Sequence, residues 1–137
     1  MTTIEQPFDT RIAAASPWRL NSLILRLEAL AALGAGIALW LANDGSLLWL
    51  LPALLVPDLS MAGYVANSRV GAVTYNLIHN WVLAPALLGL GWWMGSDVLL
   101  LAGSVVLAHV GMDRAMGYGL KLPTDFRDTH LGRIGAK

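Results

Sequence analysis

Five ionisable side chains stand within stretches of sequence that are otherwise strongly apolar: Glu28, Asp58, His79, His109 and Asp113. A charged side chain inside a bilayer costs on the order of 3 kcal/mol on insertion scales, so such residues usually face the interior of a helical bundle and serve a function. Imidazole and carboxylate groups together can bind a divalent cation, act as general acid and base, or relay protons. We therefore take these five as the candidate catalytic residues.

The spacing of these residues favours a shared site. His109 and Asp113 are four positions apart, which places them on one face of a helix with about 6 Å between their β-carbons. Both can reach one ion, or the carboxylate can orient the imidazole. Earlier in the chain, Tyr75, Asn76 and His79 follow a helical stripe that can line a pocket.

A divalent metal site held by Asp58, His79, His109 and Asp113 is the hypothesis that joins these residues. Mixed imidazole and carboxylate ligands suit Zn, Mn or Fe, and such an ion would activate water. Pro57, next to Asp58, is expected to bend its helix and free backbone carbonyls, which are potential further ligands.

The composition points to a membrane protein and excludes several classes. Hydrophobic residues make up 56% of the chain and charged residues 13%, compared with about 25% charged in soluble domains. The net charge is zero, so nucleic-acid binding is not expected. The absence of cysteine removes disulfides and thiolate ligands, and no nucleotide or flavin motif is present.

Four apolar stretches approach the roughly 20 residues that a helix needs to cross a bilayer. They run from about Asn21 to Leu41, Leu47 to Val65, Val70 to Met94 and Val98 to Leu120, with turn signals between them. We expect an all-α fold, a four-helix transmembrane bundle of residues 21–120, between a polar tail of residues 1–20 and a tail of residues 121–137. A soluble protein with deeply buried helices is the alternative.

The basic residues indicate the orientation of these spans. All nine Lys and Arg residues lie on the side of the two termini, whereas the opposite loops carry only Asp44 and Asp97. The positive-inside rule therefore places both termini in the cytoplasm and the protein in the cytoplasmic (inner) membrane. At 1.5 Å per residue, the five ionisable residues all lie within about 10–16 Å of the cytoplasmic helix ends.

The C-terminal tail offers groups for binding a substrate. Lys121 and Arg127 could supply positive charge for an anionic group, and the segment Asp128-Thr129-His130 could fold back as a lid over the cytoplasmic mouth. A solvated tail is the alternative. The predicted substrate-binding residues are Tyr75, Asn76, Tyr118, Lys121, Arg127 and His130.

Each polar residue also has a purely structural explanation. A histidine can hydrogen-bond across helices, Glu28 can neutralise Arg69 or Arg114, and tyrosines can anchor helices at the interface. These explanations do not account for two histidines, two aspartates and a glutamate at a common depth.

Several motifs resemble one bacterial family of membrane proteins, catalogued as domain of unknown function 4260. They lie between about Leu25 and Leu131 and include Arg26-Leu27-Glu28, Pro57-Asp58-Leu59-Ser60, Tyr75-Asn76-Leu77-Ile78-His79, His109-Val110-Gly111-Met112-Asp113-Arg114 and Asp128-Thr129-His130. The resemblance implies a small multi-helix membrane protein and no particular reaction.

A second, weaker similarity is to membrane-bound metal-dependent hydrolases. Their spans carry a Pro-Asp element, a threonine and histidine on a later helix, and a final His-x-x-x-Asp motif. The counterparts here are Pro57-Asp58, Thr74 with His79, and His109 with Asp113. The threonine and histidine are not adjacent in this chain, and those proteins are longer.

From these observations we expect a membrane hydrolase that acts on an amphiphilic or lipid-linked substrate, with membrane lipid as its partner. One alternative is a non-enzymatic small-molecule or ion binder or transporter, in which the same groups relay protons. Another is a structural subunit. For this class Ala32 and Gly36 form a small-residue pair on a helix face through which an oligomer could form.

Overall fold

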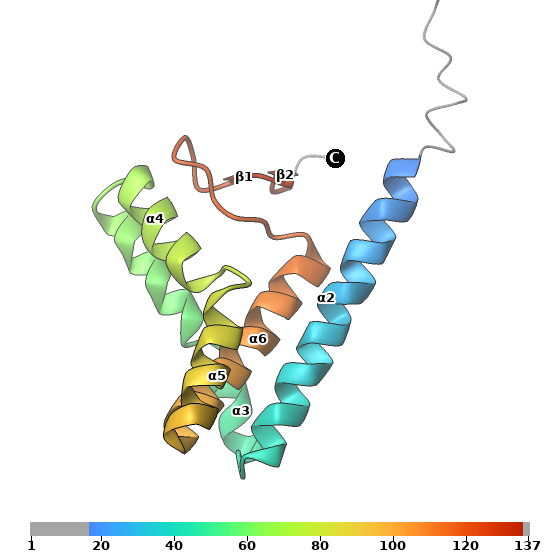
Figure 1. The fold of residues 1–137 in the computed structure, drawn as a ribbon. Coiled ribbons are helices and arrows are strands. Elements are labelled where there is room, and N and C mark those ends of the chain that lie inside the picture. Colours follow the sequence, from blue (N-terminus) through green and yellow to red (C-terminus); the bar gives the residue numbers. More distant parts are fainter. Residues whose placement is uncertain (1–16, 136–137) are drawn as a thin grey trace, which may run out of the picture.

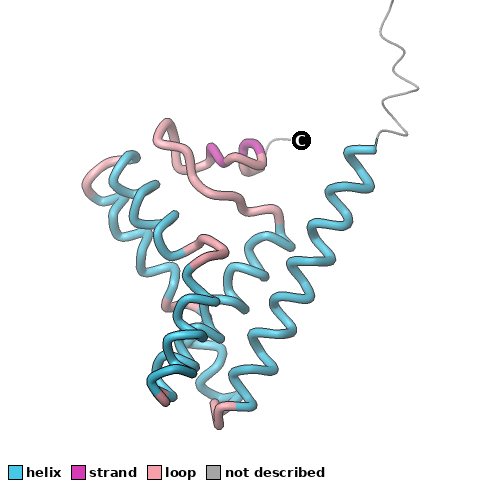
Figure 2. Tube along the Cα trace, viewed as in Figure 1, coloured by secondary structure: helices cyan, strands magenta, loops and turns pink. Residues whose placement is uncertain are grey.

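The computed structural model describes residues 17–135, which form helices joined by short loops (Figures 1 and 2). The all-α class predicted from the sequence is confirmed, apart from one small hairpin near the C-terminus. Residues 1–16 of the predicted N-terminal tail lie outside the described residues. The elements are α2 (Pro17–Ala42), α3 (Leu47–Leu54), the 3-10 helix η1 (Pro57–Val65), α4 (Ser68–Ile78), α5 (Leu83–Met94), α6 (Asp97–Met116), β1 (Asp128–Thr129) and β2 (Gly132–Arg133).

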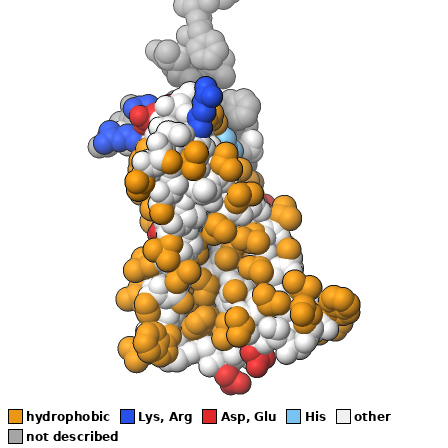
Figure 3. All heavy atoms as spheres, turned by 90° about the vertical axis from the view of Figure 1, so that its left-hand side faces the viewer, with side chains coloured by type: hydrophobic (Ala, Val, Ile, Leu, Met, Phe, Trp, Pro, Cys, Tyr) orange, Lys and Arg blue, Asp and Glu red, His pale blue; other side chains and the backbone are white. Residues whose placement is uncertain are grey.

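Three helical segments in the described chain are long and apolar enough to cross a membrane. They are Asn21–Ala42 in α2, Leu47–Val65 in α3 and η1, and Asp97–Met116, which is α6. Large apolar side chains lie on the outside, as at Leu48 (78% exposed) and Trp92 (81% exposed). Hydrophobic side chains are spread over the face shown in Figure 3, and basic side chains gather at its upper end, with acidic side chains at the opposite end. This surface is that of a membrane protein.

Helix α6 is the centre of the fold, because α2, α3 and α5 all pack against it. Small residues allow α2 and α6 to approach closely. A β-carbon at Gly36 of α2 would stand 2.5 Å from the backbone nitrogen of Ala108, and one at Gly111 of α6 would stand 2.7 Å from the carbonyl oxygen of Ala29. The Gly36 face, which the sequence suggested for pairing with another subunit, is thus covered by α6 of the same chain.

The second predicted span is helical but changes its geometry at Pro57. Helix α3 ends at Leu54, and a 3-10 helix begins at Pro57. Proline has no backbone N–H, so the α-helical hydrogen bond from residue 57 to the carbonyl of Ala53 cannot form. The N–H of Val56 bonds to that carbonyl instead, at 3.0 Å.

The third predicted span, Val70 to Met94, is two helices and not one. Helix α4 ends at Ile78 and α5 begins at Leu83. The amide of Asn80 satisfies both sides of the break: it donates to the carbonyls of Asn76 and Leu77 and accepts from the N–H groups of Val82 and Leu83. Such capping compensates for the backbone hydrogen bonds that a helix loses at its ends.

The chain after α6 crosses the end of the bundle between α4 and α2 (Figure 1). Helix α6 ends at Met116, four residues before the predicted Leu120, because Gly117 adopts a left-handed conformation with φ of 95°. The Asn76 amide then bonds to the N–H and the C=O of Lys121, at 2.7 and 2.9 Å. The side chain of Asn76 in α4 therefore holds the backbone of the C-terminal segment.

The close contact between α2 and α6 generates a first prediction. Gly36→Ala should destabilise the protein by about 1–3 kcal/mol, because its β-carbon meets the α6 backbone. Gly34→Ala is the matched control: nothing lies within 4 Å of its β-carbon, so it should be neutral or stabilise the helix by up to about 1 kcal/mol. Unfolding in mixed micelles titrated with SDS measures the free energy of unfolding of both variants. Equal effects of the two substitutions would contradict the close contact between α2 and α6.

A second prediction concerns the hairpin. Asp128 accepts a hydrogen bond from Thr124 at 2.8 Å and pairs with Arg133, and these contacts lower the pKa of Asp128 below its ordinary value of 3.8. A carboxyl group whose pKa is lower in the folded than in the unfolded chain stabilises the fold at pH values above its unfolded pKa. This stabilisation is lost as the pH falls through the pKa of the folded state. Asp128→Asn should therefore loosen the segment at neutral pH, as acid does in the wild type.

Trypsin provides the measurement, because Arg127 and Arg133 flank this part of the chain. Cleavage at these sites should be several-fold faster in Asp128→Asn than in the wild type. Asp44→Asn, in the loop at the opposite end, should leave the rate unchanged. A rate that does not respond to Asp128→Asn would show that this carboxylate does not hold the segment.

Candidate metal centre

Two histidines and an aspartate from separate elements meet inside the molecule. Asp58 lies in η1, His79 follows α4, and His109 lies in α6. The Nε2 atoms of His79 and His109 are 3.0 Å apart, and Asp58 Oδ1 lies 3.5 and 3.4 Å from them. Both imidazoles are fully buried, whereas the Asp58 side chain is 35% exposed. The three side chains thus form a triad with one open side.

The outer nitrogen of each imidazole already has a partner. His109 Nδ1 lies 2.6 Å from the carbonyl oxygen of Leu54, and His79 Nδ1 lies 2.9 Å from that of Tyr75. A carbonyl oxygen only accepts, so both Nδ1 atoms carry the proton. In neutral imidazoles the two Nε2 atoms then present lone pairs to each other, an arrangement that a cation or a shared proton stabilises. Nδ1–H donation to a carbonyl is also the usual second-sphere contact of a metal-binding histidine.

The distances fit the ligands of a single ion. The ligand atoms of Asp58, His79 and His109 all lie within 4.8 Å of one another. Two ligands bound tetrahedrally at about 2.0–2.1 Å would be roughly 3.3 Å apart. The three separations in the triad bracket that value, so it could supply three ligands and leave a position for water or substrate.

Asp113 lies beside the triad. Its Oδ2 is 3.9 Å from His79 Nε2 and 3.8 Å from His109 Nε2, and it accepts a 2.7 Å hydrogen bond from the hydroxyl of Tyr75. The Tyr75 ring is also stacked on His79, with 3.6 Å between the ring centroids. Tyr75 therefore holds both an imidazole of the triad and the neighbouring carboxylate.

A cavity of about 320 Å³ reaches Asp58 of the triad from the side of the C-terminal segment. We call it the polar cavity, because the charged side chains of Asp58, Asp113 and Lys121 line it together with apolar residues. Lys121 is 5% exposed, and its Nζ donates to the carbonyl of Phe126 at 2.9 Å. The same Nζ lies 4.1 Å from the centroid of the Phe126 ring. Burial lowers the pKa of Lys121, and the nearby carboxylate of Asp113 opposes this shift. The cavity is lined by Asp58, Met61, Tyr75, Met112, Asp113, Met116, Tyr118, Lys121, Phe126 and Ile134.

Arg114 holds the backbone at the helix break. Its guanidinium donates to the carbonyl of His79 at 2.8 Å and also to the carbonyl of Tyr118. From the sequence alone, Arg114 was expected only as a partner for Glu28. Its position next to Asp113 in the chain could have indicated that it also lies near the site.

Three predicted site residues lie away from the triad. Glu28 and His130 line a separate cavity of about 370 Å³ with Trp81 and Arg114. Among residues 17–135 no ion pair joins Glu28 to an arginine. The side chain of Arg127 is exposed.

The rotation of α2 explains the place of Glu28. Ala29 is 1% exposed and faces α6. Successive residues of an α-helix are about 100° apart. Glu28 is therefore turned out of the α2–α6 contact.

Comparison with known proteins supports the similarity found in the motifs. The family model described as "Domain of unknown function (DUF4260)" matches residues 22–134. No curated protein and no solved structure matches the chain. The similarity to metal-dependent hydrolases stays a prediction.

A third prediction tests whether Tyr75 positions the triad. Tyr75→Phe removes the hydroxyl that bonds Asp113 and should weaken metal binding about 10- to 100-fold, as loss of a second-sphere partner commonly does. Tyr64→Phe is the matched control, because the Tyr64 hydroxyl has no hydrogen-bond partner among the described residues. Titration with Zn²⁺ and a competing chelator gives both affinities, and equal affinities would exclude this role.

Proposed function

This chain belongs to the DUF4260 family, and we propose that it is a membrane-embedded, metal-dependent hydrolase. One observation carries the proposal: two buried imidazoles direct their Nε2 atoms at one point, 3.0 Å apart, beside the Asp58 carboxylate. Nitrogen and oxygen ligands of this kind suit Zn, Mn or Fe. A bound ion of this class would lower the pKa of a coordinated water and make it a nucleophile.

The chain's own residues supply the other parts of a hydrolytic site. In hydrolysis the water oxygen bonds to a carbonyl carbon or a phosphorus, the bond to the leaving oxygen breaks, and the proton lost by water passes to that oxygen. Asp113 can carry this proton, because it lies next to the triad and Tyr75 fixes its orientation. Lys121 can hold an anionic group in the same cavity.

The surroundings of the cavity favour an amphiphilic substrate. Met61, Met112 and Met116 supply adaptable apolar surface, while Asp58 and Lys121 supply charge. An ester or phosphate linked to a lipid combines both kinds of group. Entry from the cytoplasmic leaflet would bring the head group of such a molecule to the level of Lys121.

We propose four crossings, with both termini in the cytoplasm and the protein in the cytoplasmic membrane. Three helices have the length and apolarity to span, and α4 with α5 would form the fourth crossing through the break at His79–Val82. Irregular backbone at membrane depth is tolerated where it lines a cavity. The break borders the proposed metal site, which agrees with this rule.

A proton-coupled binder or transporter is the second candidate, and the same triad supports it. A proton shared between the two Nε2 atoms would also relieve the repulsion of their lone pairs, with Asp58 as counter-ion. Such a protein would bind its ligand in a pH-dependent way, would hold no metal and would show no turnover.

A fourth prediction separates these candidates. Wild-type protein extracted in mild detergent and reconstituted anaerobically with Zn, Mn or Fe should bind about one ion per chain by elemental analysis, because the triad forms a single site. His79→Gln and His109→Gln should each lose the ion and remain folded. His130→Gln should keep it, because His130 lies in the other cavity.

Wild-type protein without metal above trace level after reconstitution would end the metalloenzyme proposal. Equal metal content in all three variants would show that His79 and His109 are not ligands of the ion. Circular dichroism and gel filtration of each variant verify that loss of metal is not loss of fold.

A further inference from the structure

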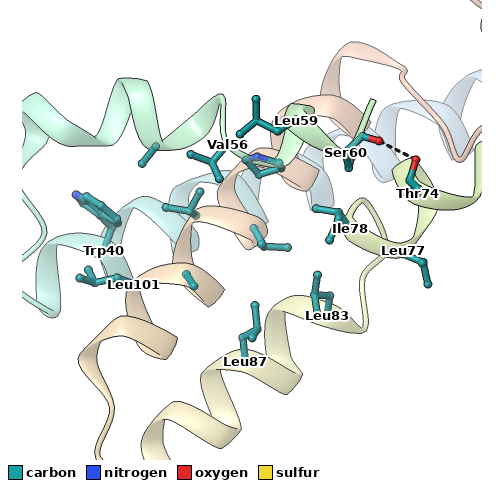
Figure 4. Close-up of a pocket in the computed structure, with 15 residues that line it drawn as sticks. Trp40, Val56, Leu59, Ser60, Thr74, Leu77, Ile78, Leu83, Leu87 and Leu101 are labelled. Carbon is teal, nitrogen blue, oxygen red and sulfur yellow. Dashed lines mark hydrogen bonds between the residues drawn. The ribbon is translucent and has the colours of Figure 1, made fainter. Parts of the chain in front are cut away.

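A large apolar groove (Figure 4) is lined by Pro57 and Ser60 of η1, whereas Asp58 and Met61 of the same helix line the polar cavity. Its volume is about 840 Å³, and its wall is formed by α3, η1, α4, α5 and α6 with Trp40 of α2. The residues that line it are Trp40, Ala53, Val56, Pro57, Leu59, Ser60, Thr74, Leu77, Ile78, Leu83, Leu87, Leu101, Ala102, Val105 and Val106.

The groove is closed at its floor and open toward the outside. Val105 and Val106 of α6 are 7% and 8% exposed, whereas Leu59 and Leu77 at the rim are 72% and 63% exposed. The rim belongs to the apolar surface that faces lipid in a membrane protein. A hydrocarbon chain could therefore enter sideways from the bilayer without crossing water.

One end of the groove borders the triad. In a 3-10 helix residues three apart share a face, so Pro57 and Ser60 line the groove while Asp58 and Met61 line the polar cavity. The Ser60 hydroxyl lies 3.5 Å from His79 Nδ1, and Thr74 donates to the Ser60 carbonyl at 2.7 Å.

The groove is apolar along its length, and its two hydroxyl side chains lie at one end. Ser60 and Thr74 lie at this end, whereas Trp40 and Leu101 lie at the opposite end (Figure 4). This arrangement runs in the same direction as that of a lipid whose head group is held at the triad.

We propose that this groove binds a hydrocarbon chain of the lipid substrate, an inference that rests on the proposed function. The volume selects this occupant. A transmembrane helix about 10 Å across would fill 840 Å³ with only about two turns. The same volume lies within the range of about 300–1,000 Å³ that small-molecule sites occupy.

The groove contributes position more than affinity. Lipid chains are as apolar as the leucines of the groove, so moving a chain from the bilayer into it gains little from the hydrophobic effect. A chain that fits the groove instead fixes where its ester or phosphate lies relative to Asp58 and the two histidines. Correct placement of a reacting bond lowers the barrier to reaction.

Photolabelling tests the proposal. The protein is placed in phosphatidylcholine vesicles with a trace of phosphatidic acid whose palmitoyl chain carries a diazirine near its methyl end. Peptides labelled after illumination are mapped by mass spectrometry. Label should concentrate on the segments of Leu87 and Leu101, and an excess of unlabelled phosphatidic acid should remove at least about nine tenths of it, as expected for a saturable site.

Filling the groove should abolish this label. Ala102→Phe adds a ring to the groove wall and should reduce labelling of these segments at least about fivefold, the loss expected when about 1 kcal/mol of fit is removed. Ala86→Phe is the matched control, because Ala86 is exposed on α5 and does not line the groove. Leu101→Trp provides a second filling variant, and only variants that elute as a single folded species are compared.

Label spread evenly over the outer helix faces of the wild type would overturn the proposal, as would equal labelling of the Ala102→Phe and Ala86→Phe variants. Metal content is measured on the same samples. Groove labelling without bound metal would reject the hydrolase and keep the chain site, whereas bound metal without groove labelling would reject the chain site alone.

Discussion

The site depends on two backbone carbonyls that accept hydrogen bonds from its imidazoles. Leu54 offers its carbonyl at the end of α3, where Pro57 prevents the α-helix from continuing, whereas the Tyr75 carbonyl also accepts the backbone N–H of His79 at the end of α4. Each accepts the Nδ1 proton of one histidine, and this fixes both Nε2 atoms toward Asp58. A buried polar backbone group without a partner costs several kcal/mol, so the break after α3 and the buried imidazole of His109 stabilise each other.

The meeting of polar residues from separate segments could be predicted from the sequence, and rotation about the helix axes could not. A constant rise per residue places polar residues at a common level once the ends of the spans are known, and the four-residue spacing of His109 and Asp113 places them on one face. Glu28 shows the limit of this reasoning. Its neighbour Ala29 takes the contact with α6, because only a small residue fits there.

The helix break and the docking of the C-terminal segment were beyond sequence reasoning for a different reason. Both depend on polar side chains that bond to backbone groups, and such partners leave no pattern in the residue types. Asn80 caps both sides of the break, and Asn76 binds the backbone of Lys121, 45 positions later in the chain. Arg114, which bonds to the carbonyl of His79, belongs to the same class. An arginine in a span signals a buried partner, but the partner here is a peptide group.

The 3-10 geometry of η1 determines how the two cavities relate to the triad. With three residues per turn, Asp58 and Met61 share one face, while Pro57 and Ser60 share another. In an α-helix, residues three apart would drift by about 60° per step, so the division between a polar and an apolar side would blur within two turns. The narrow segment therefore lets one thin wall separate the charged side chains of the polar cavity from the apolar groove. His79 stands at that wall, with its Nδ1 near Ser60 and its Nε2 in the triad, so the triad lies next to the apolar groove.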